Sequence, residues 1–298
     1  MKTYYMPSFI QNDYEGYSKL IDLYSETKEV VSENVVLNFS KVEKFESNLL
    51  SVLGAIIFNL TRNANNVNLT FDNASKRQVQ EMFIENKFPY VSQLEKTQSS
   101  GDSVNDTAIS YRVFGQKASQ QVNEYLNSEL LSKKELPKMS YLLLKEIRKN
   151  ILEIFSNAGA HGGNEIPFVF SCGQYFRDKQ RLDFTVVNCG ISIKKNVEDF
   201  LGKPCSGVET IEWALASGNT TRKGDIPGGL GMSLLREFLA EKNNNGKLQI
   251  ASADGYYAES EGKIDTKTFS SQFDGTIVNI EFNMSDNKNY ILAAEKSE

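Results

Sequence analysis

The residues best suited to chemistry recur at helical spacing along one segment near the middle of the chain. These polar side chains are Glu146, Asn150, Glu153, Asn157 and His161. Intervals of three and four residues place side chains on one side of an α-helix. A carboxylate, an amide and an imidazole on one face can bind a hard cation through oxygen and activate water or a hydroxyl beside it. The same pattern also describes a solvated helix face, and a lone histidine is more often a helix-terminal or packing residue than a catalyst.

A glycine-rich loop supplies a second group of candidates. The stretch TTRKGDIPGGLGM, residues 220–232, runs into an apolar helical pattern. It contains Thr221, Arg222, Gly228, Gly229 and Gly231. Unpaired backbone N–H groups at the start of a helix favour phosphate, and nearby hydroxyls and positive charge add to this. A glycine cluster alone is equally typical of an ordinary flexible loop.

Two strand ends complete the set. The apolar stretch LDFTVVN ends at Asn188, with Gly190 two residues later, and Gly275 and Thr276 open the stretch TIVNIEF. Each pattern by itself indicates only a turn beside a strand.

The surrounding pattern predicts the elements that must position these residues. In the second half we expect helices at 140–159, 208–216 and 232–242 and strands at 167–172, 182–188, 247–251 and 276–282. In the first half, strands at 34–40 and 67–71 alternate with helices at 47–60 and 75–86. That alternation predicts a small α/β unit with a parallel pair of strands.

The composition of the chain argues against several classes of protein. The chain has 298 residues, 40% hydrophobic and 11% aromatic, with a net charge of -5. An acidic chain argues against binding to nucleic acid.

The three cysteines fit neither a metal pattern nor a disulfide framework. The N-terminus has no apolar signal segment, and the most apolar run, 49–60, is too short to span a bilayer. We therefore expect a cytoplasmic protein without membrane attachment.

Taken together and in this order, the segments between about 140 and 284 resemble the GHKL (Bergerat) superfamily of ATP-binding domains, which includes gyrase, heat-shock chaperones, histidine kinases and anti-sigma serine kinases. Glu153, Asn157 and His161 fit its N box. TTRKGDIPGGLGM is similar to its phosphate-binding lid, and Gly275 with Thr276 is similar to its last box. The resemblance implies an α/β sandwich in which helices cover one face of a mixed sheet.

The resemblance also implies roles and cofactors, ATP and Mg²⁺. Asn157 would coordinate the magnesium, and Glu153 would be the general base. The phosphates would meet Thr221, Arg222, Gly228, Gly229, Leu230 and Gly231. The base would meet Asn188, Gly190 and Thr276. Asn188 stands where the family usually has aspartate, so the base preference of the site is open.

The first half more faintly resembles a STAS domain, the anti-sigma-antagonist fold, through the stretch VVLNFSKVEKFESNLLSVLGAII. Asn48 would then occupy the usual phosphoserine position. An unrelated small α/β domain is the alternative. The predicted organisation is a small α/β domain at 1–105, a connecting helix and loop at 106–138, and the ATP-binding domain at 139–298.

These observations favour an ATP-operated regulatory switch, either a slow ATPase or a serine/threonine protein kinase acting on a protein partner that the sequence does not identify. A homodimer is compatible with this interpretation. The alternative is a non-catalytic interaction module with a degenerate nucleotide pocket. A complete histidine kinase is disfavoured, because the single histidine belongs to the N box and none is left as phosphoacceptor.

Overall fold

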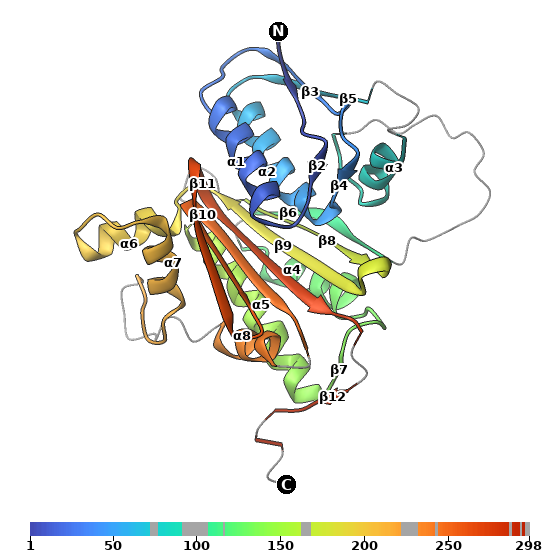
Figure 1. Ribbon diagram of the computed structural model, residues 1–298, viewed down its shortest axis with the longest axis vertical. Helices are drawn as coiled ribbons and strands as arrows, with labels where there is room; N and C mark the ends of the chain where they lie inside the picture. The colour runs from blue at the N-terminus through green and yellow to red at the C-terminus, as the bar shows by residue number, and fades with distance from the viewer. Residues whose placement is uncertain are drawn as a thin grey trace, which may run out of the picture.

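The computed structural model describes residues 1–71, 77–90, 107–115, 117–161, 168–221, 232–241, 244–285, 288–292 and 294–295. In these ranges the protein is a mixed α/β structure (Figure 1). An N-terminal unit with parallel strands and helices lies against a five-stranded antiparallel sheet that is packed against further helices. None of the helices in the described ranges combines the length and the apolarity needed to cross a membrane.

The N-terminal unit is built on a parallel sheet in the order β1-β3-β5 (Lys2–Tyr5, Asn34–Asn38 and Asn66–Thr70). A short parallel pair joins β2 (Phe9–Ile10) to β4 (Lys44–Phe45). Its helices are α1 (Tyr14–Thr27), α2 (Leu50–Arg62), preceded by the 3-10 turn η1 (Ser47–Leu49), and α3 (Arg77–Glu85). The predicted parallel pair is confirmed: β3 and β5 are parallel neighbours.

The second sheet has the order β10-β11-β9-β8-β6. Its strands are β6 (Ala108–Phe114), β8 (Val169–Phe176), β9 (Arg181–Cys189), β10 (Lys247–Ser260) and β11 (Lys263–Asn283). The accompanying helices are α4 (Ser119–Tyr125), continued by the π-helical turn η3 (Leu126–Leu130), α5 (Tyr141–His161), α6 (Ile193–Leu201), α7 (Gly207–Leu215) and α8 (Ser233–Ala240). The short strands β7 (Lys138–Met139) and β12 (Asn289–Tyr290) pair in parallel.

The prediction of a mixed sheet is wrong, because every pair in this sheet is antiparallel. Short connections account for the β8–β9 and β10–β11 pairs. β8 is joined to β9 through the single turn η4 (Arg177–Lys179), and β10 is joined to β11 through Glu261 and Gly262. Both of these last residues have positive φ, as a two-residue hairpin requires. The segment expected to be only a connecting helix and loop also supplies a strand, β6.

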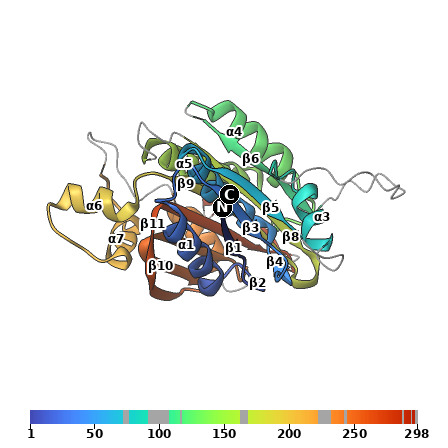
Figure 2. The same cartoon turned by 90° about the horizontal axis from the view of Figure 1, so that it is seen from above.

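Both faces of this sheet are buried, and successive side chains along a strand point to opposite faces. On one face, Phe184 and Val186 belong to the core formed with α5 and α8. On the other face, Val187 and Cys189 belong to the core formed with α1 and α2. The C-terminal helices α5 and α8 therefore pack on a single face of the sheet, while the N-terminal unit, in blue in Figures 1 and 2, covers the opposite face.

Buried polar side chains fix the N-terminal unit on the sheet. Asn48, in the η1 turn before α2, is fully buried. Its Nδ2 donates to Thr185 Oγ1 at 3.0 Å and to Asn279 Oδ1 at 3.3 Å. Glu46 is 1% exposed and accepts hydrogen bonds from Lys179 and from Arg181 Nη2, the latter at 2.8 Å. Buried polar groups are costly unless paired, so these contacts specify one docked arrangement.

The same interface holds a second buried carboxylate. Asp183 is fully buried, lies 2.7 Å from Arg181 Nη2 and stands opposite Glu281 in the β9–β11 ladder. Burial raises the pKa of the Asp183 carboxyl to about 8; Arg181 opposes the shift, and the Glu281 and Glu46 carboxylates reinforce it. In contrast, the pKa of Glu46 is lowered, because Arg181 and Lys179 outweigh its burial.

This pKa predicts how stability depends on pH. An unfolded aspartate has a pKa of about 3.9, so between that pH and the folded pKa only the folded chain keeps the Asp183 proton. In this window the contribution of Asp183 to the free energy of unfolding falls as pH rises, by at most about 1.4 kcal/mol per pH unit. Asp183→Asn should flatten the profile of urea midpoints measured from pH 5 to 8. Asp178→Asn, in the exposed η4 turn, should leave it unchanged. Identical profiles for Asp183→Asn and wild type would contradict the assignment.

Candidate functional site

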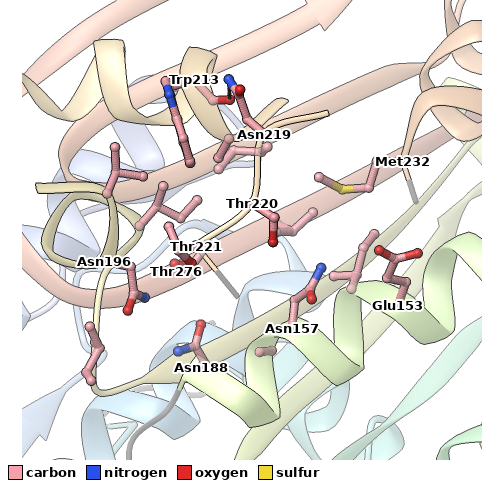
Figure 3. A pocket seen from close by; sticks show the side chains of 18 of the residues that line it. Glu153, Asn157, Asn188, Asn196, Trp213, Asn219, Thr220, Thr221, Met232 and Thr276 are labelled. Atoms are coloured by element: carbon pink, nitrogen blue, oxygen red, sulfur yellow. Dashed lines mark hydrogen bonds between the residues drawn. The ribbon is translucent and has the colours of Figure 1, made fainter. Parts of the chain in front are cut away.

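A cavity of about 170 Å³ lies between α5, the sheet and the segment that contains α6 and α7 (Figure 3). A buried water needs only about 10–15 Å³ by the same kind of measure, so the space suits an organic ligand. Its floor is apolar, with Val186, Val278 and Ile250 on three neighbouring strands. Among the described residues that line it, Glu153 is the only ionisable side chain.

Helix α5 presents two polar residues to the cavity because its apolar residues face the sheet. Ile147, Ile151 and Ile154 are buried in the core below the helix. Glu153 and Asn157 are half-buried, lie one turn apart, and both line the cavity. Figure 3 shows Asn157 between Glu153 and the strand residue Asn188.

Strand alternation brings Asn188 and Thr276 together. Both lie on the cavity face of the sheet and are direct partners in the β9–β11 ladder. Thr276 Oγ1 lies 3.1 Å from Ser252 Oγ, with which it forms a hydrogen bond. Asn188 is 2% exposed, and its Nδ2 has no hydrogen-bond partner among the described residues. A polar atom buried in this way is costly, which is a reason to look for a ligand that pairs with it.

The structure brings together five of the residues named from sequence: Glu153, Asn157, Asn188, Thr221 and Thr276 all line the cavity. Gly190 does not. Its N–H donates to the Asp274 carbonyl at 2.8 Å, and its φ of 139° is rare for a residue with a side chain, so it shapes the turn after Asn188. Five further predicted residues lie outside the described ranges: Arg222, Gly228, Gly229, Leu230 and Gly231. The helix α5 ends at His161, whose side chain also lies outside the described part of the chain.

The polar stripe of α5 therefore divides into two kinds of residue. Asn150 is buried, and its Oδ1 accepts the backbone N–H of Leu235 at 3.1 Å in the first turn of α8. Its Nδ2 donates to the Glu146 carbonyl at 2.9 Å. Asn150 thus holds α8 against α5, whereas Glu153 and Asn157 face the cavity.

Several lining residues were not identified from the sequence. Trp213 and Ala214 come from α7, and Ile193, Asn196 and Val197 come from α6. Helix α6 carried a usable signal, because Ser192 accepts a hydrogen bond from the Lys195 N–H as an N-cap. Helix α7, predicted at 208–216, carried a comparable signal in the capping box of Ser206 and Glu209. Within this helix the Trp213 carbonyl accepts a hydrogen bond from Asn219 Nδ2 at 2.9 Å.

The donor set suits a nucleotide-bound magnesium ion better than a metal held by protein alone. Among the described residues no group of three or more histidine, cysteine, aspartate or glutamate side chains could hold a metal ion. Mg²⁺ commonly takes only one or two protein oxygens, together with phosphates and water. Asn157 and Glu153 can supply such oxygens from adjacent turns of α5.

The role of Asn150 can be separated from that of the cavity residues. Asn150→Ala leaves the buried Leu235 N–H without its acceptor, so the free energy of unfolding should fall by about 1–3 kcal/mol. Lys149→Ala, at the exposed neighbouring position, should change it by no more than about 0.5 kcal/mol. Chemical denaturation of both variants tests this, and equal stability of the two would remove the packing role.

Comparison of the chain with models of known protein families and with curated proteins gives no match. The cavity and the residues that line it are therefore the basis on which function is inferred.

Proposed function

We propose that this protein binds magnesium-ATP in the cavity and acts as a nucleotide-operated switch of the GHKL type. The observation that carries the proposal is the convergence of Glu153, Asn157, Asn188, Thr221 and Thr276 on one cavity. Four separate segments of the chain supply these residues, and the resemblance to the GHKL superfamily implies a nucleotide role for each.

The two ends of the cavity suit the two ends of a nucleotide. Near Asn188 the walls are neutral and largely apolar, as a purine ring requires. The described residues that flank the glycine-rich stretch 222–231, Thr221 and Met232, both line the cavity. In Figure 3, Glu153 and Met232 lie on the side of the cavity away from Asn188, and the phosphates would lie on that side. The resemblance assigns the phosphates to the stretch 222–231, which lies outside the described residues.

Asn157 would give one oxygen to the magnesium ion, and the phosphates would give others. The bound ion would neutralise phosphate charge and orient the terminal phosphate. Glu153, one turn earlier on α5, would accept a proton at its carboxylate from the attacking water or hydroxyl. The proposed activity is accordingly slow ATP hydrolysis or phosphoryl transfer to a hydroxyl of a protein partner.

The N-terminal unit would receive the signal, because it contacts the same strands. On β9, Asn188 lines the cavity, whereas Thr185 hydrogen-bonds Asn48 on the opposite face. If the unit is STAS-like, Asn48 stands where phosphorylatable members carry serine. The neighbouring hydroxyls of Ser47 and Ser51 are buried, so they are poor phosphoryl acceptors in this arrangement. A separate protein is the better candidate substrate.

Replacing the two α5 residues separates binding from turnover. Glu153→Ala should preserve magnesium-ATP affinity but lower phosphate release or phosphotransfer by about 10²–10⁴-fold, as expected for loss of a general base. Asn157→Ala should reduce both affinity and turnover. Calorimetry gives affinity, and the fluorescence of Trp213, the single tryptophan of the chain, gives a second readout from the cavity wall.

Glu146→Ala is the matched control, since Glu146 lies two turns earlier on α5 and is not a lining residue. It should leave both quantities unchanged. Tight binding with equal turnover in wild type and Glu153→Ala would leave the non-catalytic interaction module as the function. Absence of magnesium-dependent ATP binding in wild type would refute the proposal.

A further inference from the structure

Asn188 is a buried polar residue of the cavity, and the proposed function assigns no partner to its amide nitrogen. Its side chain is 2% exposed and lines the cavity, and its Nδ2 has no hydrogen-bond partner among the described residues. An unmatched buried donor favours a ligand that offers an acceptor at this point. A ligand edge that offers an acceptor beside Asn188 would satisfy this donor.

Asn188 cannot leave the cavity to satisfy its amide in water. Its backbone lies in the middle of the sheet, paired with Val169 on one side and Thr276 on the other. Rotation of the terminal amide remains available and exchanges the positions of oxygen and nitrogen. The site thus offers one donor and one acceptor side by side, in either order.

The surroundings of Asn188 are uncharged. Val186 and Ile191 are apolar, and Asn196 and Thr276 are neutral. The single ionisable lining residue in the described ranges, Glu153, lies beyond Asn157 in Figure 3. Recognition at this end consequently depends on matching hydrogen bonds, without an ionic contribution.

We propose that Asn188 lets the cavity bind 6-oxopurine nucleotides as readily as 6-aminopurine nucleotides, an inference that rests on the proposed nucleotide site. Adenine presents an amino donor beside a ring acceptor. A 6-oxopurine presents an oxo acceptor beside a ring N–H donor. The amide matches either edge by turning over, as asparagine pairs with both a donor and an acceptor of one base. An ionised carboxylate that accepts from the adenine amino group has no donor to offer a 6-oxo group in the same place.

The test uses the full chain with magnesium and three nucleotides, ATP, ITP and GTP, measured by calorimetry and by Trp213 fluorescence. ITP carries the 6-oxo group without the 2-amino group of GTP, so it isolates the pairing at Asn188. In wild type the dissociation constants of ATP and ITP should agree within about tenfold. In Asn188→Asp, ATP binding should persist, while ITP binding should weaken by a further 10–100-fold or so.

Asn127→Asp is the matched control, because Asn127 is an exposed residue of η3 that does not line the cavity. It introduces a similar charge and should leave the ratio of ATP to ITP affinity unchanged. Wild type that binds ATP but not ITP overturns the inference, and this comparison stands even if Asn188→Asp fails to fold. An unchanged ratio in folded Asn188→Asp, or an equal shift in Asn127→Asp, also overturns it. Failure to bind any of the three nucleotides refutes the nucleotide site itself.

Discussion

The hydrogen-bonded ladder between β9 and β11 determines which side chains reach the cavity and which reach the N-terminal unit. In its register, Asn188 pairs with Thr276 on the cavity face, and Thr185 pairs with Asn279 on the opposite face. Because strand side chains alternate with a period of two, a slip by one residue would exchange the two faces. The cavity polar groups and the contacts of Asn48 would then be lost together, so one register supports both features.

The second face of the sheet explains why the two units form one structure. Apolar residues such as Phe170, Val187 and Ile277 share a core with α1 and α2. Within that apolar surface, the buried Glu46 carboxylate pairs with Arg181 and Lys179, and Arg181 also contacts the Asp183 carboxyl, whose pKa is raised. Apolar burial supplies most of the attraction, whereas buried hydrogen bonds and ion pairs act mainly on specificity, because a misplaced partner leaves a buried charge unmatched. The position of the N-terminal unit on the sheet is therefore defined by buried hydrogen bonds and ion pairs as well as by the shape of the apolar surfaces.

Much of the local structure was predictable because it rests on periodicity along the chain. Helix α5, strand β9 and the face shared by Glu153 and Asn157 follow from spacing alone. Helix α1 also had a signal that the sequence analysis passed over, since Asp13 accepts the Gly16 N–H and Tyr17, Leu20, Ile21 and Tyr24 recur on its buried face. Tyrosine has a lower helix propensity than alanine or leucine, which weakens this signal.

Features that depend on distant pairing were not predictable. The antiparallel order of the sheet is set by hydrogen bonds between strands far apart in sequence, and the participation of β6 depends on its pairing with β8. Asn150 and Asn157 look alike in the sequence, yet one is buried against α8 and the other faces the cavity, because only the packed structure distinguishes two amides on one helix. The unpaired Nδ2 of Asn188 likewise emerges only from three-dimensional neighbours.

The contacts of α1 also set an order of events during synthesis. Tyr14 donates to the Thr268 carbonyl across a separation of 254 residues, and Tyr24 donates to Asp274 across 250. At ribosomal rates of about 5–20 residues per second, that separation corresponds to roughly 13–50 s. During this interval the aromatic face of α1 has no β11 to pack against. The apolar surface by which the N-terminal unit packs on β11 therefore stays uncovered until β11 has been synthesised.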